Sequence, residues 1–218
     1  MKLLLTSAGF SNKSIVDALG DLANRPFSQL SLSFIPTAAN VEEGSKDWLI
    51  NDLVNCKNLG LRSIDIVDIS ALDYKVCRSR LEKTDIIFVG GGNSFHLMNW
   101  LKRSGLDKEL PGMLENKIYV GLSAGSCITA KWWSNKYELK FYKEKPEKVD
   151  RFNCLGFVDL FIMPHLNDPF FPNVRLEKLE LIAREINKPL YALDNNSAVK
   201  IVGEKITVVS EGEWHKFN

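Results

Sequence analysis

The chain has 218 residues, of which 45% are hydrophobic and 25% are charged, and its 28 basic and 27 acidic side chains leave a net charge of +1. This composition is typical of a soluble globular protein, and the length fits one domain with a sizeable core, spanning residues 1–218. The balanced charge, without a basic block, argues against a nucleic acid or an anionic membrane surface as a partner.

The apolar runs and the cysteines bear on the cellular compartment. The N-terminal run Leu3–Leu5 is too short for a signal-peptide core, and no run approaches the ~20 apolar residues of a membrane-spanning helix. The four cysteines are scattered and show no C-x-x-C spacing. We therefore expect a cytoplasmic protein with reduced thiols, without a disulfide framework or a zinc site.

Short apolar runs alternate with segments of helical period along the first half of the chain. The runs predict strands at Lys2–Thr6, Leu30–Ile35, Ser63–Ile69, Asp85–Val89 and Lys117–Leu122. The periodic segments predict helices at Ser14–Leu22, Glu43–Leu59, around Leu81, and at Phe95–Lys102 and Lys108–Asn116. Such alternation is typical of an α/β fold.

The second half is less regular. It begins with a charged segment, Tyr137–Val149, that we expect to be a loop. The elements predicted after it are a strand at Leu160–Met163, a helix at Arg175–Ile186, and strands at Leu190–Leu193, Ala198–Val202 and Ile206–Ser210. The last two strands are joined by a tight turn and suggest an antiparallel hairpin. The sequence thus predicts a three-layer α/β sandwich around a mixed, mostly parallel sheet, with sites beyond the carboxyl ends of its strands.

The stretch Gly121-Leu-Ser123-Ala-Gly125 follows a predicted strand and opens a predicted helix. This G-x-S-x-G pattern is typical of a sharp turn that lifts a serine hydroxyl clear of the sheet. The free N–H groups of the following helix would point to the position where negative charge develops in acyl transfer. Ser123 is therefore the candidate nucleophile, although a serine in such a turn can also serve only as a helix cap.

Gly90-Gly91-Gly92-Asn93 ends the preceding predicted strand. Three glycines can present backbone N–H groups into the same crevice, so Gly92 and Ala124 are candidate donors to an oxyanion. A phosphate-binding turn is a weaker alternative, because the full glycine-rich nucleotide patterns are absent. A plain strand-to-helix turn with Asn93 as its N-cap is the third interpretation.

The chain has three histidines, and His165 alone follows a predicted strand, after Pro164. That position suits a general base within reach of Ser123. We expect His96 to be a packed or surface helix residue and His215 to be exposed in the tail. A triad also needs a residue that orients the imidazole, and the candidates are Asp194, Asn195, Asp168 and Asp159.

Three blocks in this order, Val89 to Phe95, Gly121 to Gly125, and Pro164-His165, resemble the aspartyl dipeptidase (peptidase E) family of serine peptidases, which is related to cyanophycinase. The similarity runs from the first strand to the Ala198–Val202 strand. The resemblance implies a class-I glutamine-amidotransferase-like α/β fold and a mechanism without metal or cofactor. It also implies removal of an N-terminal aspartate from short peptides by a monomer or homodimer.

Carried over by position, the resemblance makes Ser123 the nucleophile, His165 the base, and Gly92 and Ala124 the oxyanion donors. The family's carboxylate falls at Asn195, with Asp194 next to it as the alternative. The family's arginine for acidic substrates falls at Arg175, which could also be a solvated helix-end charge. Glu138 stands where peptidase E has an acidic residue, and would hold the α-amino group of the substrate.

Two functions follow from these residues. The first is a serine peptidase acting on short peptides, with an N-terminal Asp as the implied preference. The second, suggested by an amide at Asn195, is a catalytically impaired relative that binds a peptide or amino-acid ligand in the same crevice. An amidotransferase-like enzyme is disfavoured because a serine occupies the turn, whereas Cys127 lies four residues later and is expected to pack in the helix.

Overall fold

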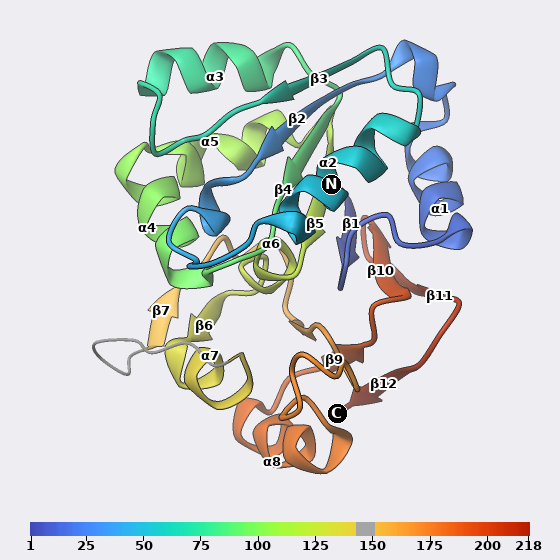
Figure 1. The fold of residues 1–218 in the computed structure, drawn as a ribbon, viewed down its shortest axis with the longest axis vertical. Coiled ribbons are helices and arrows are strands. Elements are labelled where there is room, and N and C mark those ends of the chain that lie inside the picture. Colours follow the sequence, from blue (N-terminus) through green and yellow to red (C-terminus); the bar gives the residue numbers. More distant parts are fainter. Residues whose placement is uncertain (143–150) are drawn as a thin grey trace.

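A seven-stranded sheet forms the centre of the computed structural model, which describes residues 1–142 and 151–218 (Figure 1). Its strands, in the order in which they lie side by side, are β11 (Lys205–Ser210), β10 (Ser197–Val202), β1 (Lys2–Thr6), β5 (Ile118–Leu122), β4 (Ile86–Val89), β2 (Ser31–Ile35) and β3 (Ser63–Ile66). Strands β1, β5, β4, β2 and β3 are parallel, while β10 joins β1 and β11 joins β10 in antiparallel pairings. The mixed, mostly parallel sheet and the late hairpin are thereby confirmed.

Helices cover both faces of this sheet. One face carries α1 (Lys13–Ala23) and α2 (Asp47–Asn58), and the other carries α3 (Tyr74–Glu82), α4 (Ser94–Arg103) and α5 (Leu106–Met113). Successive residues of β4 alternate between the two cores: Phe88 packs on the first face and Ile87 on the second. The strands are apolar throughout because both of their faces are buried, which gives the three layers that the sequence predicts.

The remaining elements lie mostly beyond the carboxyl ends of the central strands, in the lower half of Figure 1. They are α6 (Ala124–Cys127), β6 (Trp132–Ser134), α7 (Asn135–Phe141), β7 (Arg151–Asn153), β8 (Phe161–Met163), α8 (Leu176–Ile186), β9 (Leu190–Leu193) and β12 (Trp214–Phe217), with short 3-10 helices at Phe27–Gln29 and Thr37–Ala39. Strands β12, β9 and β8 form a second sheet in which β8 and β9 are parallel. The sequence did not predict that this second sheet is separate.

The predicted loop at Tyr137–Val149 is wrong where the structure describes it. Residues 137–141 belong to α7, and residues 143–149 lie outside the described part of the chain. The charges of Lys136 and Lys140 make this segment resemble a loop in the sequence, although Tyr137 and Phe141 form a buried face of the helix. The neighbouring Trp133, in β6, is fully buried as well.

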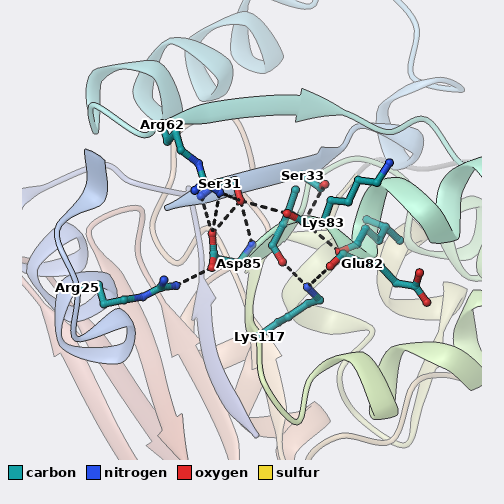
Figure 2. A network of polar contacts seen from close by, with 10 residues as sticks. Arg25, Ser31, Ser33, Arg62, Glu82, Lys83, Asp85 and Lys117 are labelled. Atoms are coloured by element: carbon teal, nitrogen blue, oxygen red, sulfur yellow. Dashed lines mark hydrogen bonds and ion pairs between the residues drawn. The ribbon is translucent and has the colours of Figure 1, made fainter. Parts of the chain in front are cut away.

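A polar network ties together the amino ends of β2, β4 and β5, opposite the ends that carry the candidate residues (Figure 2). Asp85 accepts hydrogen bonds from the Ser31 backbone N–H at 2.9 Å and from Arg25 at 2.6 Å. Lys117 donates to the carbonyl oxygens of Glu82 and Thr84. Although partial burial opposes ionisation, the Ser31 and Arg25 donors lower the pKa of Asp85 to about 2, so the carboxylate stays charged at neutral pH.

All four cysteines are free thiols, and Cys127 is buried in α6 as expected. Among the described residues, no helix combines the length and the apolar character needed to cross a bilayer.

Candidate active site

Ser123 occupies a sharp turn between β5 and α6. Its backbone has φ 48° and ψ −109°, a conformation that residues with a Cβ rarely adopt. The Ser123 N–H donates to Thr6 O at 3.1 Å, and the Ser123 carbonyl accepts the N–H groups of Ser126 and Cys127. These bonds hold the strained turn to the end of β1, with the half-exposed hydroxyl at the carboxyl edge of the sheet.

The two flanking glycines are required by the close approach of α6 to the sheet. A Cβ on Gly125 would lie 2.1 Å from Val89 O, and one on Gly121 would lie 2.7 Å from Gly125 O. Both neighbours are backbone atoms that cannot rotate away. The G-x-S-x-G pattern therefore reflects packing of the turn against β4 as well as the conformation of the serine.

His165 lies within hydrogen-bond distance of Ser123. The loop after β8 carries it, with the backbone at φ 65° and the His165 N–H donating to Ser7 Oγ at 2.8 Å. His165 Nε2 lies 3.0 Å from Ser123 Oγ, and the Phe171 ring packs against the imidazole at 4.7 Å between centroids. The carboxyl ends of two separate sheets thus meet at this pair. The sequence predicted Ser123 from its G-x-S-x-G pattern and His165 from its place after a strand.

The other two histidines lie away from this pair. His96 is a half-buried residue of α4, and His215 is exposed on β12.

Asn195, and not Asp194, faces the imidazole. His165 Nδ1 lies 2.8 Å from Asn195 Oδ1. Asp194 turns the other way and accepts hydrogen bonds from the Asn196 and Glu213 N–H groups and from the Ser197 hydroxyl. The structure therefore assigns Asp194 to the turn between β9 and β10. Another candidate acid, Asp159, forms ion pairs with Lys131 and Lys188 instead.

Two further residues, Ser7 and Asp168, extend the cluster of Ser123, His165 and Asn195. Ser7 is fully buried, and its hydroxyl lies 3.4 Å from Asn195 Oδ1 while it accepts the His165 N–H. Asp168, one of the four candidate acids, accepts a hydrogen bond from Asn195 Nδ2 at 2.5 Å. Ser7 directly follows β1, so the rule that sites lie at carboxyl strand ends could have found it.

The surroundings of the His165 imidazole favour its neutral form at neutral pH. Burial lowers the pKa of His165 below its ordinary value of 6.5, while the hydrogen bond with Asn195 and the charge of Asp168 act in the opposite direction. A neutral imidazole with Nδ1–H toward Asn195 has its Nε2 lone pair directed at the Ser123 hydroxyl. The three side chains therefore have the arrangement of nucleophile, base and orienting group that acyl transfer requires.

The glycine loop after β4 lies beside the serine turn. Gly92 has φ 122°, and a Cβ there would lie 2.3 Å from Ala38 O, so only glycine fits. Neither the Gly92 N–H nor the Ala124 N–H donates a hydrogen bond within the described part of the chain. Asn93 accepts the His96 N–H at 2.9 Å, which confirms it as the N-cap of α4.

The two candidate substrate-binding residues lie in different surroundings. Arg175 is half-buried, and its guanidinium donates to the carbonyl oxygens of Phe171 at 3.2 Å and of Val174 at 2.8 Å, in the loop that also carries Asp168. Glu138 is 4% exposed and accepts a hydrogen bond from the Trp133 indole at 2.7 Å. The role of Glu138 toward an α-amino group stays a prediction.

No potential metal site emerges in residues 1–142 and 151–218, where no three His, Cys, Asp or Glu side chains gather in a ligating group.

The sequence matches a model of peptidase family S51 over residues 3–209. It is 28% identical over 207 residues to an uncharacterized peptidase of Pasteurella multocida, covering 94% of this chain and 95% of that one. It is 30% identical over 164 residues to a peptidase E of Shewanella amazonensis, covering 72% and 68% of the two chains.

A solved structure supports the same relationship. The protein, from Listeria monocytogenes EGD-e, is provisionally described as a peptidase E. It superposes with a TM-score of 0.79 at 28% identity, over 97% of this chain and 98% of that one.

Proposed function

Because the chain belongs to peptidase family S51, we propose that it is a serine peptidase whose nucleophile is Ser123 and whose base is His165. The observation that carries the proposal is the pair of contacts on the imidazole: Ser123 Oγ at 3.0 Å from Nε2 and Asn195 Oδ1 at 2.8 Å from Nδ1. A binding protein would not need a strained serine aligned with a half-buried imidazole.

The reaction would proceed through an acyl-enzyme. Ser123 Oγ attacks the peptide carbonyl carbon while His165 Nε2 takes the hydroxyl proton. The N–H groups of Gly92 and Ala124 donate to the oxyanion that forms. The C–N bond then breaks as His165 returns the proton to the leaving amine, and a water molecule, deprotonated by His165, hydrolyses the ester.

The substrate class that we propose is a short peptide with an N-terminal aspartate. Arg175 supports it, because its guanidinium is a cation on the loop that follows His165, and its Nε has no acceptor among the described residues. A planar guanidinium suits a carboxylate through paired hydrogen bonds.

A panel of dipeptides tests both the reaction and the preference. We expect Asp-Xaa peptides to be hydrolysed with a higher kcat/KM than the matched Asn-Xaa peptides, which differ only in the charge of the side chain. Equal turnover of both series would contradict the preference for aspartate but not the proposed peptidase activity. No turnover, together with no labelling of Ser123 by a fluorophosphonate, would favour the impaired relative that only binds its ligand.

The pH dependence of kcat/KM should follow the protonation of His165. The base must be neutral, and burial lowers the pKa of His165, so kcat/KM should stay constant at neutral pH and fall on the acid side, with a midpoint below 6.5. The loss must occur as pH decreases, because protonation removes the Nε2 lone pair. An acid limb centred above 6.5 in steady-state rates would contradict this assignment.

A further inference from the structure

The Asp168 carboxylate contacts the candidate triad through Asn195, and the Asp168 backbone N–H donates to the His165 carbonyl at 3.2 Å. Its Oδ2 accepts the Asn195 Nδ2–H at 2.5 Å, and its Oδ1 accepts the Phe170 backbone N–H at 2.6 Å. The Arg175 guanidinium donates to the Asp168 backbone carbonyl at 3.4 Å and so holds the same loop from the other side. The side chain is half-buried, and its two hydrogen bonds fix its position.

The orientation of the Asn195 amide follows from this contact. A carboxylate only accepts hydrogen bonds, so the amide must turn its NH₂ group to Asp168 and its oxygen to His165. An amide oxygen facing Nδ1 requires Nδ1 to carry the proton, which leaves Nε2 as the acceptor for the Ser123 hydroxyl. Without Asp168, the amide could turn over and present its NH₂ group to Nδ1, which would favour the wrong tautomer.

Asp168 also supplies the charge that an amide lacks. In the usual serine triad, a carboxylate in contact with the imidazole stabilises the imidazolium that forms during the reaction. Here the Asp168 carboxylate lies behind Asn195, and its charge acts to raise the pKa of His165 against the effect of burial. The other groups close to the imidazole are the Tyr142 and Phe171 rings and the Ser7 hydroxyl, none of which is charged at neutral pH.

We propose that Asp168 is a positioning residue for the triad: it sets the orientation of Asn195 and thereby the tautomer of His165, and it provides the negative charge behind the neutral third member. This inference rests on the proposed peptidase function. It makes Asn195 and Asp168 a matched pair, because two carboxylates at these positions would repel each other unless one took up a proton.

The first variant is Asp168→Asn, which keeps the shape of the side chain and removes its charge. We expect kcat/KM to fall about ten- to a hundredfold, as for other residues that orient a functional group from behind. The acid limb of the pH profile should move to lower pH, because loss of a nearby negative charge lowers the pKa of His165. The matched control is Asp159→Asn, which removes a carboxylate that pairs with Lys131 and Lys188. This variant should leave kcat/KM and the acid limb unchanged.

The second variant, Asn195→Asp with Asp168→Asn, exchanges the two groups. The carboxylate now accepts the His165 Nδ1–H directly and the new amide at 168 can donate to it. We expect kcat/KM to recover above that of Asp168→Asn alone and the acid limb to move back to higher pH. A residue that merely stabilised the loop would not be rescued by a change at position 195, so absence of recovery would overturn the proposal.

The tautomer is measured separately by ¹⁵N NMR of the His165 ring. The native protein should show Nδ1 protonated and Nε2 unprotonated, and Asp168→Ala should increase the share of the other tautomer. This readout needs no substrate, so it tests Asp168 even if the dipeptide panel fails. If the native protein hydrolyses peptides and Asp168→Asn has the same pH profile of kcat/KM, the role of Asp168 is refuted and the proposed peptidase activity is not.

Discussion

Replacing Ser123 by alanine should reduce kcat by about 10⁶-fold, because removal of a serine nucleophile costs about as much as removal of the whole triad. The remaining activity above the uncatalysed rate would come from the oxyanion donors and from substrate binding. The measurement is turnover of the best dipeptide of the panel by native and variant protein, with fluorophosphonate labelling of both. Alanine keeps the Cβ of the strained turn, so the variant should fold normally.

The matched control for this experiment is Ser104→Ala. It removes another half-buried serine hydroxyl, which donates to Leu101 O at 3.1 Å at the end of α4 and has no contact with the triad. This variant should retain native turnover and native labelling. If Ser123→Ala retained them as well, Ser123 would not be the nucleophile and the proposed mechanism would be wrong.

Gly125→Ala should damage both the fold and the site. The added Cβ would lie 2.1 Å from Val89 O and 2.8 Å from Val89 C, so α6 must move away from β4. Forced overpacking of this kind typically costs about 1–3 kcal/mol of unfolding free energy. The shift carries Ser123 with it, and a displacement of about 1 Å can reduce turnover about 10²-fold.

Thermal unfolding and turnover of the same preparation check this prediction, and Gly112→Ala is its control. Gly112 lies in α5, and apart from its chain neighbours and the backbone of its own helix no described atom lies within 4 Å of the position of an added Cβ. Alanine there should be neutral or stabilising by up to about 1 kcal/mol, as in other helices. Equal stability and activity of the two variants would mean that the close approach of α6 to β4 does not shape the site.

Local pattern was sufficient to predict much of the central sheet. Strands β1, β2, β4 and β5 are short apolar runs between turn residues, and nothing in their surroundings opposes that preference, so their ends were predicted to within a residue or two. The failure at α7 has the opposite cause. Its alternating charges hide a helix that packs Tyr137 and Phe141 into the core, because packing outweighs composition there.

The sequence by itself determined which strand ends carry the candidate residues: Ser123 after β5, the glycines after β4, and His165 as the one histidine at such an end. Only the tertiary structure decided that His165 and Asn195 arrive from a second sheet, and that Asn195 and not Asp194 meets the imidazole. The strand ends can be located from the sequence because burial repeats regularly along a strand and leaves a periodic pattern of apolar residues. The contacts of the imidazole depend instead on side-chain directions in loops. There the adjacent residues Asp194 and Asn195 bond to different partners, and Asn195 donates to Asp168, which is distant in the sequence.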